Sequence, residues 1–192
     1  KDVENYVSKL LEYEQDPLSK GWEAKFLSFG GKLYGFKNGH SDSEIMADDF
    51  YSQYLKGKWN GNWHKFFDTG NNLPPSIYAS TGGDLQKLLS EGYPFVDEIS
   101  HGAQYGWFID SIGGYSFYGA RSLKNKGFSI ITTMSCQTNA FDNSEEAGAN
   151  DPCLSEAFIR NPESGVLAYL GCSRFGVVGK GFGNRLSYSM LY

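Results

Sequence analysis

The chain has 192 residues, of which 40% are hydrophobic and 20% are charged, and its formal net charge is -5. This length and composition are typical of one folded domain with a sizeable core, and they exclude a disordered tail. No basic segment stands out, which argues against nucleic acid as a partner. No apolar run approaches the roughly 20 residues of a membrane-spanning helix, so we expect no membrane-spanning segment. We expect residues 1–192 to form a single domain.

The predicted elements alternate between helix and strand along the chain. Apolar residues recur at helical spacing in some segments, and short β-branched or aromatic runs separate them. Asn38-Gly39 is a strong turn signal inside a polar loop, and Ser43 is the predicted N-cap of the next helix. In chain order we expect helix 3–11, strand 24–29, helix 43–55, strand 64–68, helix 81–89, strand 94–100, helix 117–124, strand 128–134, helix 153–160 and strand 166–171.

The remaining segments are predicted loops. They are a glycine- and aromatic-rich stretch at 103–115, an acidic stretch at 142–151 and a glycine-rich stretch at 173–184. Strands that alternate with helices at short spacing favour an α/β fold, with an open, mostly parallel sheet and helices on both faces. The chain contains no internal repeat and no heptad pattern.

Two predicted strands end in side chains that can perform chemistry. His101-Gly102 follows the strand at 94–100, and Ser135-Cys136 follows the strand at 128–134. If these strands are parallel neighbours, about 4.8 Å apart, an imidazole and a thiol lie together at one edge of the sheet. The imidazole can help to form the nucleophilic thiolate and can then protonate a leaving amine. A structural histidine and a small buried cysteine are the alternative interpretation.

The chain has three cysteines, Cys136, Cys153 and Cys172. An odd number prevents complete internal pairing, and no Cys-x-x-Cys motif indicates a zinc or redox site. Either one bridge with one free thiol or three free thiols fits the sequence. Cys153 begins a predicted helix, where a thiol pKa can be lowered, but we expect it to be a poorer nucleophile than Cys136.

Several motifs, in this order, resemble those of gingipain-type peptidases. Ile-Ser-His-Gly at 99–102 resembles the histidine motif of the clan CD peptidases, which include caspases, legumains, clostripains and gingipains. The cysteine follows 35 residues later (136 minus 101). Residues 151–160 resemble the helix after the nucleophile in gingipains, and residues 165–171 resemble the next strand. The resemblance runs loosely from Tyr6 to Val178.

This resemblance implies a caspase- and gingipain-like three-layer α/β/α fold and a cysteine endopeptidase that forms a thioester acyl-enzyme. It implies His101 as the base, Cys136 as the nucleophile and Gly102 as an oxyanion donor. It further implies protein or peptide substrates, no cofactor for the chemistry, and a secreted or cell-envelope location. We expect the chain to be a gingipain-like catalytic subdomain, a piece of a longer precursor with other domains.

The sequence departs from the gingipain pattern at two positions. Phe29 stands where some gingipains place an acidic residue behind the histidine, and Lys37 stands where Arg- or Lys-specific gingipains place an aspartate in the P1 pocket. A lysine there, with Arg174, is predicted to favour acidic side chains in the substrate; solvated loop cations are the alternative. Ile99 and Met134 are candidate pocket walls, or ordinary strand residues.

Three further interpretations stay open. The acidic run at 142–146 can supply hard oxygen ligands for a structural Ca²⁺, although a solvated loop is the default and no other metal is expected. A catalytically inactive scaffold that binds protein is one alternative to a peptidase. A glycan-binding module, suggested only by the 13 tyrosines and 4 tryptophans, is the other.

Overall fold

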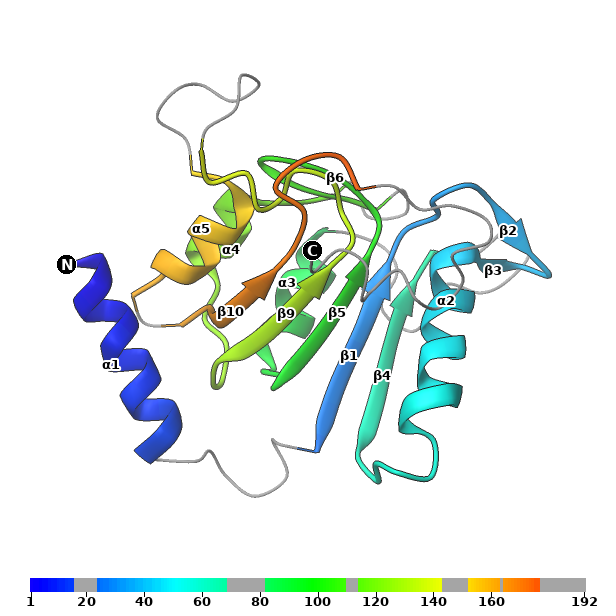
Figure 1. The fold of residues 1–192 in the computed structure, drawn as a ribbon, viewed down its shortest axis with the longest axis horizontal. Helices are drawn as coiled ribbons and strands as arrows, with labels where there is room; N and C mark the ends of the chain where they lie inside the picture. The colour runs from blue at the N-terminus through cyan, green and yellow to red at the C-terminus, as the bar shows by residue number, and fades with distance from the viewer. Residues whose placement is uncertain (16–23, 69–81, 110–113, 143–151, 163, 177–192) are drawn as a thin grey trace.

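The computed structural model describes residues 1–15, 24–68, 82–109, 114–142, 152–162 and 164–176. Helices and strands alternate as the sequence predicts (Figure 1). The helices are α1 (Asp2–Gln15), α2 (Asp42–Phe50), the π-helix η1 (Tyr51–Leu55), α3 (Gly82–Ser90), α4 (Phe117–Ser122) and α5 (Leu154–Arg160). The strands of the main sheet are β1 (Lys25–Gly30), β4 (Asn62–Phe67), β5 (Phe95–Ile99), β9 (Ser129–Thr133) and β10 (Val166–Leu170).

The main sheet has five strands in the order β10-β9-β5-β1-β4, and every pair is parallel. The two strands that carry the predicted chemistry, β5 and β9, are neighbours, with Glu98 opposite Thr133. The chain leaves β1 towards β4 and then returns to the other side of β1 at β5. Connections therefore diverge at the carboxyl ends of β1 and β5, which is where open α/β sheets bind their ligands.

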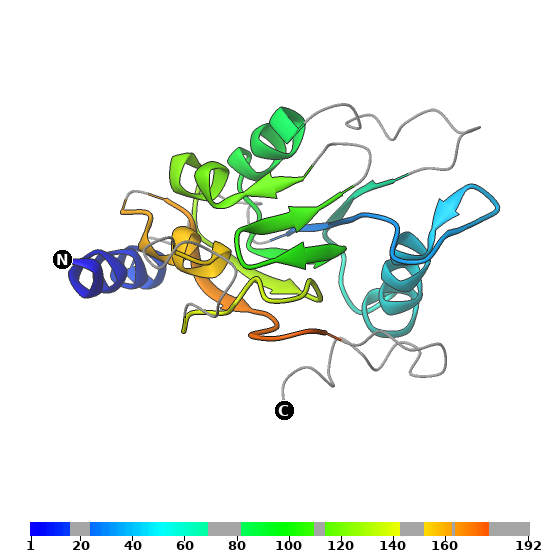
Figure 2. The same ribbon diagram turned by 90° about the horizontal axis from the view of Figure 1, so that it is seen from above.

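Helices cover both faces of this sheet, as expected. One face packs against α3, α4 and α5 through the larger core cluster, which includes Leu85, Phe117 and Phe158. The other face packs against α2 through a smaller cluster of Ala47, Phe67, Ile99 and Met134. Figure 2 shows α2 (cyan) and α3 (green) on opposite sides of the sheet. Burial of these apolar side chains is the main force that fixes the layers.

Two local details differ from the predictions. The N-cap of α2 lies two residues earlier than expected, at Ser41 in place of Ser43. The Ser41 hydroxyl accepts the Glu44 N–H at 3.2 Å. The stretch 103–115, expected to be loop, contains a small antiparallel sheet of β6 (His101–Ala103), β7 (Gly106–Phe108) and β8 (Tyr115–Ser116). Its short strands and tight turn carry too few residues for a strand pattern to be recognised.

Another antiparallel pair, β2 (Phe36–Lys37) and β3 (His40–Ser41), lies between β1 and α2. Asn38 and Gly39 form its turn with positive φ angles of 54° and 86°, as the Asn-Gly signal predicts. The N-terminal helix α1 is attached beside α5 and β10 by Lys9, whose ammonium donates to four carbonyl oxygens. None of the described helices is long and apolar enough to cross a membrane.

Candidate active site

The two predicted catalytic strand ends lie in direct contact. Gly102 makes this contact, because a Cβ built on it would lie 2.6 Å from Ser135 Cβ and 3.1 Å from the Cys136 carbonyl oxygen. Real Cβ atoms do not approach that closely, so only glycine lets the backbone after His101 pack on the backbone before Cys136. His101 and Cys136 are thereby brought to the same edge of the sheet.

The buried carboxyl group of Glu98 is hydrogen-bonded to residues at both strand ends. Glu98 on β5 is completely buried, and its side chain accepts hydrogen bonds from the hydroxyls of Ser100, Thr133 and Ser135. Ser135 Oγ also lies 2.9 Å from the Ser100 carbonyl. Burial is the main cause that raises the pKa of Glu98 to about 7, against the pull of the three hydroxyls. The network ties the residue before His101 to the residue before Cys136.

The imidazole of His101 is exposed and is oriented by a main-chain group. Its Nε2 lies 3.0 Å from the carbonyl oxygen of Leu33, in the loop between β1 and β2. A carbonyl can only accept, so Nε2 carries the proton in this contact. In the neutral ring Nδ1 is then the nitrogen with a free lone pair, which is the form that a general base needs.

The thiol of Cys136 is half-buried and has a main-chain donor. The Gly176 N–H donates to Cys136 Sγ at 3.3 Å, and Sγ lies 3.7 Å from the Gly176 carbonyl oxygen. Gly176 belongs to the segment after β10, which is attached to the turn after Cys136 by a hydrogen bond of 2.9 Å from the Gln137 N–H to the Arg174 carbonyl. The main chain at Gly176 thus contacts the sulfur of Cys136 through both its N–H and its carbonyl oxygen.

The other two cysteines are in less reactive surroundings. All three cysteines are free thiols in this structure. Cys153 is buried at the N-cap of α5, and burial raises its thiol pKa. The pKa of Cys172 is raised to about 11, first by burial and then by the nearby Cys136 and Glu98. Both shifts disfavour the thiolate at Cys153 and Cys172, and the assignment of Cys136 as the nucleophile stays a prediction.

The remaining predicted site residues are distributed around this edge and beneath it. Lys37 is exposed on the β2–β3 hairpin, and Arg174 forms an exposed ion pair with Asp142, at 2.6 Å. Ile99 and Met134 are each 4% exposed in the smaller core cluster. The roles of these four residues in substrate binding stay predictions, as does that of Gly102 in the oxyanion site.

The predicted Ca²⁺ ligands at 142–146 lie outside the described residues, apart from Asp142. Within the part of the chain that the structure describes, no group of three or more His, Cys, Asp or Glu side chains could hold a metal ion. Phe29, at the position of the missing acidic residue, is buried and packs edge-on against Trp107 with ring centroids 5.1 Å apart.

Three contributors to the site were missed from the sequence, namely Leu33, Gly176 and Glu98. Two of them act through main-chain atoms, which residue types do not reveal. The glycine-rich segment after β10 was the only signal for Gly176, since glycine after a strand end often marks a close backbone approach. Glu98 and its neighbour Asp97 are charged residues within a predicted strand, and a charged residue there can signal a buried polar role.

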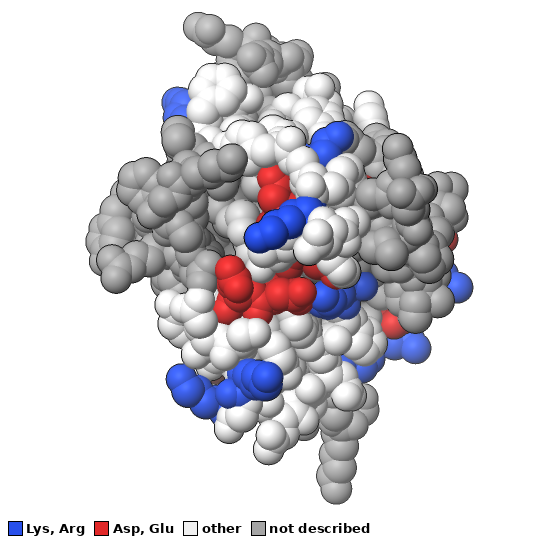
Figure 3. All heavy atoms as spheres, turned by 90° about the vertical axis from the view of Figure 1, so that its right-hand side faces the viewer, with Lys and Arg blue, Asp and Glu red and all other residues white. Residues whose placement is uncertain are grey.

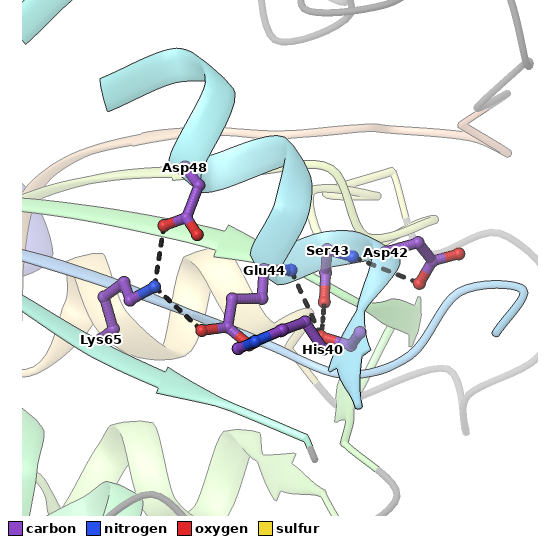
Figure 4. Close-up of polar contacts among 7 residues, drawn as sticks. His40, Asp42, Ser43, Glu44, Asp48 and Lys65 are labelled. Carbon is purple, nitrogen blue, oxygen red and sulfur yellow. Dashed lines mark hydrogen bonds and ion pairs between the residues drawn. The ribbon is translucent and has the colours of Figure 1, made fainter. Parts of the chain in front are cut away.

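A separate group of charges lies on the outer side of α2. The face over α2 shows acidic side chains in the middle of the view with lysines around them (Figure 3). Lys65 forms ion pairs with Glu44 at 2.8 Å and Asp48 at 2.7 Å, and His40 Nδ1 lies 2.8 Å from Glu44 (Figure 4). These contacts fasten α2 to β4.

Comparisons with known proteins agree with this architecture. The model of peptidase family C25 matches residues 1–192. A solved structure described as that of a protease superposes with a TM-score of 0.67 at 19% identity, covering 92% of this chain and 35% of the other. The complex of Porphyromonas gingivalis RgpB pro- and mature domains gives 0.63 at 18%, covering 90% and 38%.

The Arg-specific cysteine proteinase gingipain R (RGPB) also gives a TM-score of 0.63 at 18% identity, covering 90% of this chain and 37% of the other. At these identities the superpositions establish the fold. The chain spans little more than a third of the length of these solved structures. No curated protein sequence matches the chain.

Proposed function

Because the chain belongs to peptidase family C25, we propose that it carries the nucleophile and the base of a cysteine endopeptidase. In this proposal Cys136 Sγ attacks the carbonyl carbon of a peptide bond, and His101 Nδ1 takes the thiol proton. His101 then gives that proton to the leaving amine as the C–N bond breaks. Water next attacks the resulting thioester, with His101 again as the base, and releases the acid and the free thiol.

The observation that carries the proposal is the contact between the His101-Gly102 and Ser135-Cys136 strand ends. Two arrangements support it. The Leu33 carbonyl lies at Nε2 of His101 and leaves Nδ1 to act as the base, and the Gly176 N–H donates to Cys136 Sγ. The Gly102 N–H is proposed to stabilise the oxyanion, since it directly follows the base and lacks a Cβ that would exclude a substrate carbonyl.

We also propose that substrates with an acidic P1 side chain are preferred. Lys37 is the exposed cation of the β2–β3 hairpin, close in sequence to the loop that contacts His101. Arg174 contributes less in this proposal, because Asp142 already neutralises its charge. A secreted or cell-envelope location, and attachment to further domains of one precursor, are proposed from the family alone.

Covalent labelling followed by mass spectrometry tests the proposal. We expect a peptidyl acyloxymethyl ketone to add once to the protein, at Cys136, and Cys136→Ala and His101→Ala to abolish the addition. Cys153→Ala is the matched control, since its thiol is buried, and it should label like the wild type. Cleavage of a positional-scanning peptide library, measured in parallel, gives the P1 preference. Unchanged cleavage by Cys136→Ala would refute the assignment, and labelling without cleavage would favour an inactive binding scaffold.

A further inference from the structure

The orientation of His101 depends on the loop from Gly31 to Gly35, because Leu33 in this loop supplies the only acceptor that the structure assigns to Nε2 among the described residues. The loop starts where β1 ends, and the Gly31 N–H donates to the Ile99 carbonyl at 3.1 Å. Residues 32–35 belong to none of the sheets formed by the described residues, and the next strand along the chain is β2. The Leu33 carbonyl therefore stays in place only if something else holds the loop.

Asp42 forms four hydrogen bonds with residues 33–35 of this loop. Its Oδ1 accepts the Leu33 N–H at 2.9 Å, and its Oδ2 accepts the N–H of Tyr34 at 2.7 Å and that of Gly35 at 3.3 Å. The Asp42 N–H donates in return to the Gly35 carbonyl at 3.1 Å. Three consecutive amides thus point at one carboxylate, and hydrogen bonds to an ionised acceptor are stronger than those to a neutral one.

Asp42 is not needed for the two ordinary tasks of an acidic residue at this position. The N-cap of α2 is Ser41, whose hydroxyl accepts the Glu44 N–H. The ion pairs that fasten α2 to β4 use Glu44 and Asp48 with Lys65. Figure 4 shows the Asp42 side chain directed away from Lys65. Its carboxylate is committed to the loop and to the Ser43 N–H at 3.2 Å.

A second carboxylate holds the other end of the loop. Asp68 follows β4, is 2% exposed, and its Oδ2 accepts the Lys32 N–H at 3.1 Å. Leu33 is therefore held between two residues whose amides are each bound by an acidic side chain. This arrangement fixes the direction of the Leu33 carbonyl without any carboxylate touching the imidazole.

We propose that Asp42 is a positioning residue for the catalytic base: its carboxylate fixes the 33–35 loop, and the Leu33 carbonyl in turn fixes the ring orientation and tautomer of His101. This inference rests on the proposed peptidase function. It explains how the chain can dispense with an acidic side chain at Phe29, since the negative charge acts one hydrogen bond further away, through the peptide backbone. Asp68 supports the same loop from the opposite side.

The experiment compares Asp42→Ala and Asp42→Asn with Asp48→Asn in the full chain. Asp48 lies on the same helix and loses the same charge, but it contacts Lys65 and not the loop. We expect Asp42→Ala to lower kcat about 10- to 100-fold with little change in KM, because small misplacement of a catalytic group costs on this order. Asp42→Asn keeps one acceptor oxygen, so its kcat should lie between those of the wild type and of Asp42→Ala. The kcat of Asp48→Asn should stay within about twofold of the wild-type value.

A second readout does not need activity. The chain has only three histidines, so long-range ¹H–¹⁵N NMR of ring nitrogens can be assigned with a His101→Gln variant. At a pH where imidazole is neutral, His101 should be protonated at Nε2 in the wild type and in Asp48→Asn. Asp42→Ala should show a mixture of the two tautomers, while retaining the methyl-region chemical shifts of a folded core.

The outcomes separate the two proposals. A full-strength Nε2–H signal, or an unchanged kcat, in a folded Asp42→Ala variant would overturn the positioning role. If Cys136→Ala keeps its activity, the peptidase assignment fails, and the tautomer measurement still decides whether Asp42 orients His101. If the tautomer changes and kcat falls, while Asp48→Asn behaves as the wild type, both proposals stand.

Discussion

Replacing Glu98 by glutamine removes an ionisable group from the junction of the two strand ends. Glu98 is fully buried, and its hydrogen-bond partners are the hydroxyls of Ser100, Thr133 and Ser135. The folded protein raises the pKa of Glu98 from 4.5 to about 7, chiefly through burial. Between these two values the folded state binds more protons than the unfolded state. The contribution of Glu98 to the free energy of unfolding is therefore greatest below pH 4.5 and is lost as the pH rises through 7.

The size of this effect follows from the shift. A change of 2.5 units, from 4.5 to about 7, corresponds to about 3 kcal/mol at most, at 1.36 kcal/mol for each unit. Between about pH 5 and about pH 8.5 the wild type should lose about 2.5 kcal/mol through Glu98 alone. Glutamine keeps a similar shape and a hydrogen-bonding amide but cannot ionise, so this part of the pH dependence should disappear.

The assay is urea unfolding of the wild type and Glu98→Gln at several pH values, with the free energies of unfolding compared as a difference. Taking the difference removes the contributions of groups that do not interact with Glu98. The difference should grow in favour of the glutamine variant as the pH rises. Parallel curves would show that Glu98 is already ionised in the folded protein, and the reasoning from burial would be wrong.

Three further changes test other parts of the structure. Gly102→Ala places a Cβ 2.6 Å from that of Ser135, so it should separate the strand ends and lower the rate of Cys136 labelling about 100-fold or more. Lys9→Met leaves four carbonyl oxygens without their donor and should lower the free energy of unfolding by about 1–3 kcal/mol in urea titration; no change would show that water replaces the ammonium. Lys37→Ala should lower cleavage after acidic P1 residues about tenfold and leave neutral P1 residues unaffected, and equal losses on both would contradict the proposed preference.

The order of elements was largely predictable because periodicity records which side chains are buried. The runs at 94–100 and 128–134 are rich in β-branched and aromatic residues, as strands in the middle of a parallel sheet usually are. The pairing of His101 with Cys136 was conditional on these strands being parallel neighbours, and the structure confirms that they are. The small β6–β7–β8 sheet was not predictable, since its strands have only two or three residues each and no repeating pattern can develop over that length.

The parts of the site that sequence reasoning missed are those in which the main chain acts. The Leu33 carbonyl orients His101 and the Gly176 N–H contacts Cys136, and neither group depends on the side chain at that position. Glu98 is visible in the sequence as one of two charged residues in a predicted strand. Its hydrogen-bond partners could not be predicted, because they depend on the register that sets Glu98 opposite Thr133, and register between strands distant in the chain is a property of the folded sheet.

The position of Phe29 shows why this site uses a main-chain acceptor. Phe29 lies on β1 directly opposite Glu98 on β5, and its ring is buried against Trp107. A carboxylate at that position would lose hydration in an apolar core and would lie beside another acidic group, and both effects oppose ionisation. Asp42, the first residue of α2, is only partly buried and reaches the imidazole through the Leu33 peptide group. If this is correct, Phe29→Glu should not restore a charged partner for His101, and it should destabilise the fold more than it alters kcat.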